Sequence, residues 1–211
     1  MATPLLIRQI NHVARQAART ALCAAFTVVA RMRLWLNGAQ VGSGFRCSGW
    51  LHLYIHPRAS VTIGPRVRIH SGAGVNFVGS GQRMCIHVAC GAKLRIGADV
   101  GMSNSVIVVS QEVVIGDETL LGGGCLITDS DLHALPLRSV SEGLGAWRPK
   151  CAAVRIDRLV FLGAGATVLK GSTIGDRVVV GARSVVSGVI APGTVVCGPS
   201  ATPLPTRLKI G

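Results

Sequence analysis

Apolar residues, replaced in places by Ser or Thr, recur at every sixth position through most of the chain after residue 60. The positions are Val61 and Val67, then Val88, Leu94, Val100 and Val106, then after one extra residue Val113, Thr119 and Cys125, and finally Val160, Ala166, Ser172, Val178, Ser184 and Ile190. A second apolar residue often follows two places later, and a glycine often comes next, as at Gly64, Gly97 and Gly163. A strand alternates with period two and a helix with period 3.6, so neither sustains a spacing of six.

A solenoid explains this period. Each hexad supplies one short strand with its first residue pointing inward, followed by a corner where glycine adopts dihedral angles that strain other residues. Three hexads close one triangular coil. Stacked coils then pair their backbone N–H and C=O groups with the coils above and below. The pattern therefore predicts an all-β solenoid built of parallel strands.

Two breaks interrupt the period, a long one over residues 129–153 and a shorter one over residues 71–87. A loop of the longer kind inside a compact solenoid is more often functional than accidental. Its polar and aromatic residues include Asp129, Asp131, His133, Trp147 and Arg148. We expect the candidate site to include this loop.

The N-terminus has a different pattern, because residues 5–36 are rich in alanine, lack proline and glycine, and alternate arginines with apolar side chains. The longest uncharged run, residues 20–30, is roughly half the length that spans a bilayer, and no A-x-A signal-peptidase site follows it. A basic amphipathic helix lying on the inner face of a membrane is the favoured interpretation. The alternative is a helix that caps one end of the β stack or packs between subunits.

One domain is the best description of 211 residues. We divide the chain into a basic, apolar helical segment at 1–45, a β-helix at 46–206 that carries the 129–153 loop, and a short tail at 207–211. Seven cysteines form no C-x-x-C pair, and their odd number favours reduced, buried thiols over a disulfide framework. We expect no metal site.

Charge is distributed very unevenly. The net charge is +13, yet the first acidic residue is Asp99, and residues 1–98 contain twelve Arg and Lys. The basic half should therefore face something anionic. It lacks a base-reading basic helix, zinc-finger spacing and an RNP-type aromatic strand, so a membrane surface or an acidic glycan is a better partner than nucleic acid.

Two blocks resemble the hexapeptide-repeat acetyltransferases, in particular the sugar and polysaccharide O-acetyltransferases related to the colanic-acid, nodulation-factor and galactoside enzymes. They are IGDETLLGGGCLITDSDLHAL at 115–135 and FLGAGATVLKGSTIGDRVVVGARSVVSGVIAPGTVVCGPSA at 161–201. The resemblance is close in the C-terminal half and weaker back to about Val61, and the first sixty residues show no specific match. It implies a left-handed parallel β-helix and a homotrimer whose active sites lie in grooves between subunits. A period of six by itself fixes neither handedness nor assembly.

The same resemblance assigns roles at the site. His133 matches the family's catalytic histidine, and imidazole suits proton abstraction from a sugar hydroxyl near neutral pH. Asp131 or Asp129 would hold the imidazole in the correct tautomer, although aspartate is also a common turn residue. The backbone N–H of Ala164 matches the family's oxyanion donor.

Acetyl-CoA is the implied acyl donor, lying along the C-terminal coils. The residues expected to contact it are Phe161, Gly163, Ala164, Lys170, Ala182 and Arg183, with Arg207 and Lys209 as further candidates for its phosphates. Asn104, Trp147 and Arg148 are the candidates for contacting the acceptor. The chain departs from the family pattern after its last hexads, at Ser187–Gly188 and at 198–201, so details of nucleotide binding differ.

These features predict an acetyl-CoA-dependent O-acetyltransferase that acts on a sugar or lipid-linked glycan during synthesis of surface polysaccharide or glycolipid. We place it in the cytoplasm, at the inner face of the membrane. Because fold does not fix the acceptor, the alternatives are N-acetylation of an amino or nucleotide sugar, serine O-acetylation, or a non-catalytic scaffold. A γ-type carbonic anhydrase would need three metal-binding histidines, and His70 and His87 lack that family's spacing.

Overall fold

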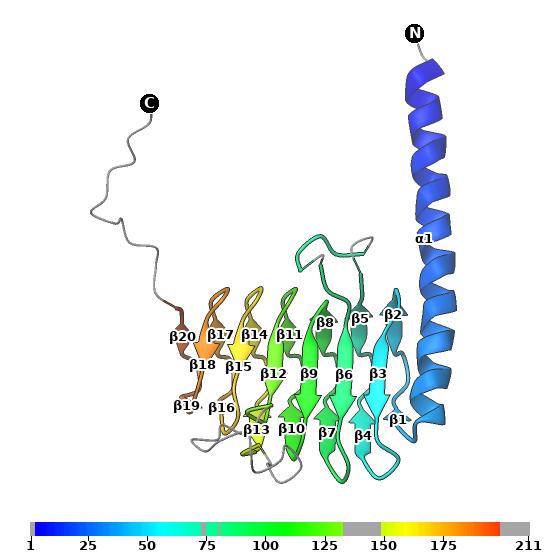
Figure 1. Ribbon diagram of the computed structural model, residues 1–211. Coiled ribbons are helices and arrows are strands. Elements are labelled where there is room, and N and C mark those ends of the chain that lie inside the picture. The colour runs from blue at the N-terminus through cyan, green and yellow to red at the C-terminus, as the bar shows by residue number, and fades with distance from the viewer. Residues whose placement is uncertain (1–2, 73–74, 80, 133–148, 199–211) are drawn as a thin grey trace, which may run out of the picture.

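The computed structural model describes residues 3–72, 75–79, 81–132 and 149–198. A helix, α1 (Thr3–Leu36), precedes twenty short strands that wind into a three-sided prism (Figure 1). Every strand pair between coils is parallel. The predicted all-β solenoid with an N-terminal helix is therefore confirmed.

Each face of the prism is one parallel sheet. Sheet A contains β1 (Gln40–Val41), β4 (Ser60–Ile63), β7 (Lys93–Ile96), β10 (Glu112–Ile115), β13 (Val154–Ile156), β16 (Thr173–Ile174) and β19 (Val189–Ile190). Sheet B contains β2 (Arg46–Ser48), β5 (Arg68–His70), β8 (Gly101–Ser103), β11 (Leu120–Leu121), β14 (Phe161–Leu162), β17 (Val179–Val180) and β20 (Val195–Val196). Sheet C contains β3 (His52–Ile55), β6 (Cys85–Val88), β9 (Val106–Val109), β12 (Leu126–Thr128), β15 (Thr167–Val168) and β18 (Val185–Val186).

The core is a column of aliphatic side chains inside the prism, including the fully buried Leu94 and Ile156. Inward hexad positions that carry hydroxyls are buried too, and their polar atoms are paired within the chain. The Thr119 hydroxyl donates to the Asp157 carbonyl at 3.0 Å, and the Ser172 hydroxyl donates to the Leu169 carbonyl at 2.6 Å. Such pairing lets a polar residue occupy a core position at little cost.

One predicted inward position is wrong. Val106 is half-buried, whereas Ile107 and Val109 are fully buried. The turn at Asn104, which has a φ of +44°, is one residue shorter than the equivalent turn of the next coil, because Gly101 pairs with Leu120 and Val106 pairs with Leu126. Since residues 106–109 are all apolar, the spacing alone could not fix the phase of this strand.

The C-terminal half of α1 caps the first coil, so the capping alternative is confirmed for this half. Ala30 and Leu34 are buried against the coil, and the Thr27 hydroxyl accepts from the Cys47 N–H at 3.0 Å. A positive φ of 76° at Gly38 ends the helix and turns the chain into β1. The solenoid thus begins at Gln40, ahead of the predicted boundary at residue 46.

The N-terminal half of α1 extends beyond the prism, on the same side as the residues between β5 and β6 (Figure 1). Its arginines and apolar side chains are exposed there, including Val13 and Arg15. No helix among the described residues contains a stretch long and apolar enough to cross a membrane.

Candidate active site

The three edges of the prism differ in how their turns satisfy backbone N–H groups. We name them by the sheets that they join, in chain order: the A–B, B–C and C–A edges. At the A–B edge, the Asp117 carboxylate accepts from the Ala98 N–H at 2.7 Å, and the Asp176 carboxylate accepts from the Arg158 N–H at 3.0 Å. Aspartate side chains thus cap turns along this edge.

The C–A edge has a stronger cap. Asp129 is fully buried, and its carboxylate accepts from the N–H groups of Ser110, Gln111 and Glu112, each at 2.7 Å. Both of its oxygens are therefore committed to the main chain of the preceding coil. This geometry gives Asp129 a structural task at the start of the 129–153 loop, and a direct role in orienting His133 stays a prediction.

The base of that loop is a short antiparallel ladder. Ser130 and Cys151 form a bridge, the Asp131 N–H donates to the Lys150 carbonyl at 3.1 Å, and the Ala152 N–H donates to the Asp129 carbonyl at 2.9 Å. The ladder fixes the backbone two residues before position 133. His133, Trp147 and Arg148 themselves lie outside the described residues.

Asp131 forms an ion pair with Lys170, and both side chains are about two-thirds buried. Lys170 was predicted to bind the phosphates of the donor, but it lies on the C–A edge beside the loop. It is a partner for Asp131 that sequence reasoning missed, because the two residues lie on different coils. The pair places a lysine beside the carboxylate proposed to orient the base.

Three turns of the B–C edge, those after β11, β14 and β17, are uncapped. In the residues that the structure describes, no acceptor pairs with the N–H groups of Gly123, Ala164 or Ala182, which occupy the same turn position in three successive coils. The coils stack closely here, since a Cβ on Gly163 would lie 2.5 Å from the Ala182 nitrogen. Three free donors therefore form a column along this edge.

A hollow of about 440 Å³ opens at this column. It is lined by Val78, Gly79, Gln82, Gly123, Gly124, Ala164, Gly165 and Arg183. Arg183 adopts a positive φ of 58°, and its side chain passes over Gly165, where an added Cβ would lie 3.3 Å from the Arg183 Cγ. The predicted donor contacts Ala164, Ala182 and Arg183 thus lie on one edge, with Gly163 in the same turn as Ala164.

Phe161 lies next to this edge, on the outer face of sheet B. Its side chain is 44% exposed, and it aligns with Leu120 and Val179 on the neighbouring strands. The three residues form an apolar strip on the outer face of sheet B. Phe161 is therefore accessible, and its contact with the acyl donor stays a prediction.

Asn104 shapes the hollow from inside the protein. It is fully buried, and its amide oxygen accepts from the Gly72 N–H at 2.7 Å, while its amide nitrogen donates to the carbonyls of Asn76 at 3.1 Å and Val78 at 3.2 Å. These bonds tie down the described part of residues 71–84, which we call the 71–84 excursion. Its role as an acceptor contact stays a prediction, and the visible role is to hold the excursion over the B–C edge.

The thiols and charged pairs add little to the site. None of the seven cysteines forms a disulfide, but Cys90, Cys151 and Cys197 are exposed, so the expectation of uniformly buried thiols is wrong. Burial raises the pKa of Cys47 to about 12, and the Arg66 guanidinium lowers the pKa of Asp99 by hydrogen bonding. No three His, Cys, Asp or Glu side chains of the described segments are grouped as metal ligands.

No family profile matches the chain. A curated protein of Escherichia coli strain K12, named "Putative lipopolysaccharide biosynthesis O-acetyl transferase WbbJ", is 40% identical over 92 residues, which are 42% of this chain and 47% of that protein. The match thus spans about half the length of the relative.

Solved structures share the fold. The N-acyltransferase AntD of Bacillus cereus, in complex with dTDP and 3-hydroxybutyryl-CoA, superposes with a TM-score of 0.59 at 18% identity, covering 80% of this chain and 83% of that one. A hexapeptide-repeat acetyltransferase of Vibrio cholerae, complexed with acetyl-CoA, superposes with a TM-score of 0.51 at 22% identity, covering 80% and 70%. The resemblance to hexapeptide-repeat acetyltransferases is therefore confirmed, in sequence over 92 residues and in the left-handed β-helix fold over most of the chain.

Proposed function

We propose that this chain is an O-acetyltransferase that moves an acetyl group from acetyl-CoA to a sugar hydroxyl, in the synthesis of surface polysaccharide or glycolipid. The column of free N–H groups on the B–C edge is the observation that carries the proposal. On each of the other two edges aspartate carboxylates accept from some of the turn N–H groups, whereas the described turns of the B–C edge contain no Asp or Glu, which leaves this edge suited to an external acceptor. The curated relative, whose name assigns it to lipopolysaccharide O-acetylation, supports the acceptor class.

The chemical groups of acetyl-CoA, the acyl donor, match those of the B–C edge. A pantetheine arm carries amide carbonyls that accept hydrogen bonds, and Gly123, Ala164 and Ala182 offer donors at regular spacing. Arg183 supplies a cation for phosphate, for which a guanidinium is well suited. Phe161 provides an apolar surface for the arm's methylene groups.

In the transfer, His133 accepts the proton of the sugar hydroxyl as the oxygen bonds to the thioester carbon. The Ala164 N–H donates to the carbonyl oxygen as it becomes negative. The carbon–sulfur bond then breaks, and the leaving thiolate takes up the proton that the imidazole holds. The sugar leaves as its acetyl ester and the donor leaves as the free thiol.

A second copy of the chain is needed for this chemistry. Asp131 and the start of the 129–153 loop lie on the C–A edge, whereas Ala164 lies on the B–C edge, with sheet C between them. One chain therefore holds the two halves of the site on different edges. A trimer that places the C–A edge of one subunit against the B–C edge of the next would unite them.

The exposed N-terminal half of α1 supports a site of action at the inner face of a membrane. Its arginines suit anionic headgroups. The 71–84 excursion projects on the same side (Figure 1) and exposes Phe77, which is 85% accessible. Both features would bring the B–C edge close to a lipid-linked acceptor.

Substitution of the proposed base tests the function. His133→Ala should lower kcat for acetyl transfer by roughly 10²–10⁴-fold, and His56→Ala, in the C–A turn of the first coil rather than in the 129–153 loop, serves as the control. A screen of hydroxyl and amine acceptors with labelled acetyl-CoA separates O- from N-acetylation. Unchanged turnover in His133→Ala, with the oligomer intact, would remove His133 as the base.

A further inference from the structure

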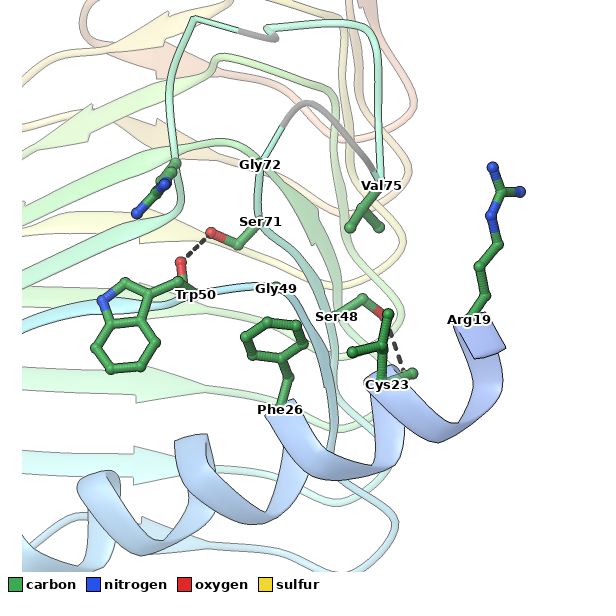
Figure 2. Close-up of a pocket in the computed structure, with 11 residues that line it drawn as sticks. Arg19, Cys23, Phe26, Ser48, Gly49, Trp50, Ser71, Gly72 and Val75 are labelled. Atoms are coloured by element: carbon green, nitrogen blue, oxygen red, sulfur yellow. Dashed lines mark hydrogen bonds between the residues drawn. The ribbon is translucent and has the colours of Figure 1, made fainter. Parts of the chain in front are cut away.

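A second cavity lies apart from the B–C hollow, between α1, the 48–50 turn and the 71–84 excursion. Its volume is about 480 Å³, within the usual range of ligand sites. It is lined by Arg19, Leu22, Cys23, Phe26, Ser48, Gly49, Trp50, Ser71, Gly72, Val75 and Arg83. Figure 2 shows Phe26 rising from the helix toward the 48–50 turn, with Ser71 and Val75 beyond that turn.

The lining of this cavity is apolar and cationic. Leu22, Phe26, Trp50 and Val75 provide the apolar surface, and no carboxylate lines it. Arg19 and Arg83 are exposed, and no acidic side chain of the described segments pairs with either. Such a cavity matches a ligand that has both a hydrocarbon part and a negative charge.

The serine hydroxyls of the cavity and one face of its Trp50 ring already have partners within the chain. The Ser71 hydroxyl donates to the Trp50 carbonyl, and the Ser48 hydroxyl pairs with the Cys23 thiol at 3.0 Å. The Arg33 guanidinium lies 4.5 Å from the centre of the Trp50 ring and covers one of its faces. Few polar groups remain to read a base or a sugar, so a nucleotide is a poor occupant.

The 71–84 excursion separates this cavity from the B–C hollow. Val78, Gly79 and Gln82 line the hollow, whereas Val75 and Arg83 line the cavity. A molecule held in the cavity therefore lies one loop away from the column of free N–H groups. This arrangement suits an acceptor that is anchored at one end and acetylated at the other.

We propose that the cavity binds the anchor of a lipid-linked acceptor, a long-chain lipid phosphate whose hydrocarbon packs on Leu22, Phe26 and Val75 and whose phosphate meets Arg19 and Arg83. This rests on the proposed function, because it names the class of acceptor for the same site. The cavity thereby selects membrane-borne glycans over free saccharides. Because the lipid phosphate is held in the cavity, the attached sugar is free to reach the B–C edge.

Binding of a simple probe tests the cavity without any turnover. Dodecyl phosphate should bind the full-length protein in calorimetry, whereas dodecanol and inorganic phosphate should each bind at least tenfold more weakly. The double variant Arg19→Glu/Arg83→Glu should weaken dodecyl phosphate at least tenfold. Arg15→Glu/Arg58→Glu changes the net charge equally at exposed positions outside the cavity, and should retain binding. Equal weakening by both variants, or equal affinity for inorganic phosphate, would overturn the proposal.

Filling the cavity gives an independent test. Leu22 is exposed, so Leu22→Trp should fold, as circular dichroism would verify, and should block the probe by volume rather than by charge. With a lipid-linked acceptor, Leu22→Trp should raise KM at least tenfold while transfer to a water-soluble sugar stays unchanged. If the wild-type protein acetylates no sugar, the proposed function fails, and the binding of dodecyl phosphate still decides the identity of the cavity's ligand.

Discussion

The C–A and B–C edges of the prism are built from the same hexads, yet their central turns differ in how backbone N–H groups are paired. On the C–A edge one buried carboxylate, Asp129, satisfies three of them. On the B–C edge the N–H groups of Gly123, Ala164 and Ala182 have no acceptor among the described residues, and Gly123 and Ala164 line a hollow. The repeat thus supplies equivalent turns, and the side chains decide whether a turn is closed for stability or left open for a ligand.

Among variants that compare the two edges, the largest effect should come from removing one donor of the open edge. Ala164→Pro deletes the N–H at a turn position where Pro65 and Pro192 already stand in the A–B turns, each followed by a residue with positive φ. Proline favours this turn position, so the fold should persist. The loss of one oxyanion donor should lower kcat roughly 10²–10³-fold. A kcat within twofold of wild type, with the melting temperature unchanged, would exclude Ala164 as the donor.

Removing the cap of the closed edge should instead affect stability. Asp129→Ala leaves three N–H groups without their acceptor and should lower the free energy of unfolding by about 3 kcal/mol or more. Asp117→Ala, an exposed cap of a single N–H on the A–B edge, should cost about 1 kcal/mol. Urea denaturation of both variants measures the difference. A stable Asp129→Ala protein with greatly reduced kcat would instead assign Asp129 to catalysis.

Substitutions of Arg183 on the B–C edge and Lys170 on the C–A edge should have smaller and different effects. Arg183→Met should weaken coenzyme A about tenfold, the effect of losing one charge-assisted hydrogen bond. Lys170→Met should leave coenzyme A affinity unchanged and should lower kcat, because it removes the ion pair that holds the Asp131 carboxylate at the base of the 129–153 loop. Calorimetry and kcat measurements on this matched pair decide the assignment. Tenfold weaker coenzyme A binding in Lys170→Met would restore Lys170 as a phosphate contact.

Much of the fold was predictable because the hexads specify inward side chains directly. Residues such as Leu94 and Val178 are buried where the period of six places them. The first coil was missed because residues 40–56 lack clean hexads, and its packing depends on contacts with α1 such as the bond from Arg33 to the Leu51 carbonyl at 2.6 Å. Long-range contacts of this kind leave no trace in local periodicity.

The site was predictable in part. The position of Ala164 followed from the resemblance, and the aligned turns at 122–124, 163–165 and 181–183 could have added Gly123 to the column. The partners of Lys170 and Asn104 could not be read from sequence, since each bonds to a residue on another coil or in the 71–84 excursion. Asp129 was identified as polar and near the loop, but its three backbone partners depend on the stacking of coils.

Amide hydrogen exchange with and without coenzyme A tests the central claim most directly. The open edge should gain protection at residues 123, 164 and 182, while the capped turns at residues 98, 110 and 111 should exchange at the same rate with or without the ligand. Protection confined to the capped edges, or none at the three open positions under saturating coenzyme A, would contradict the account.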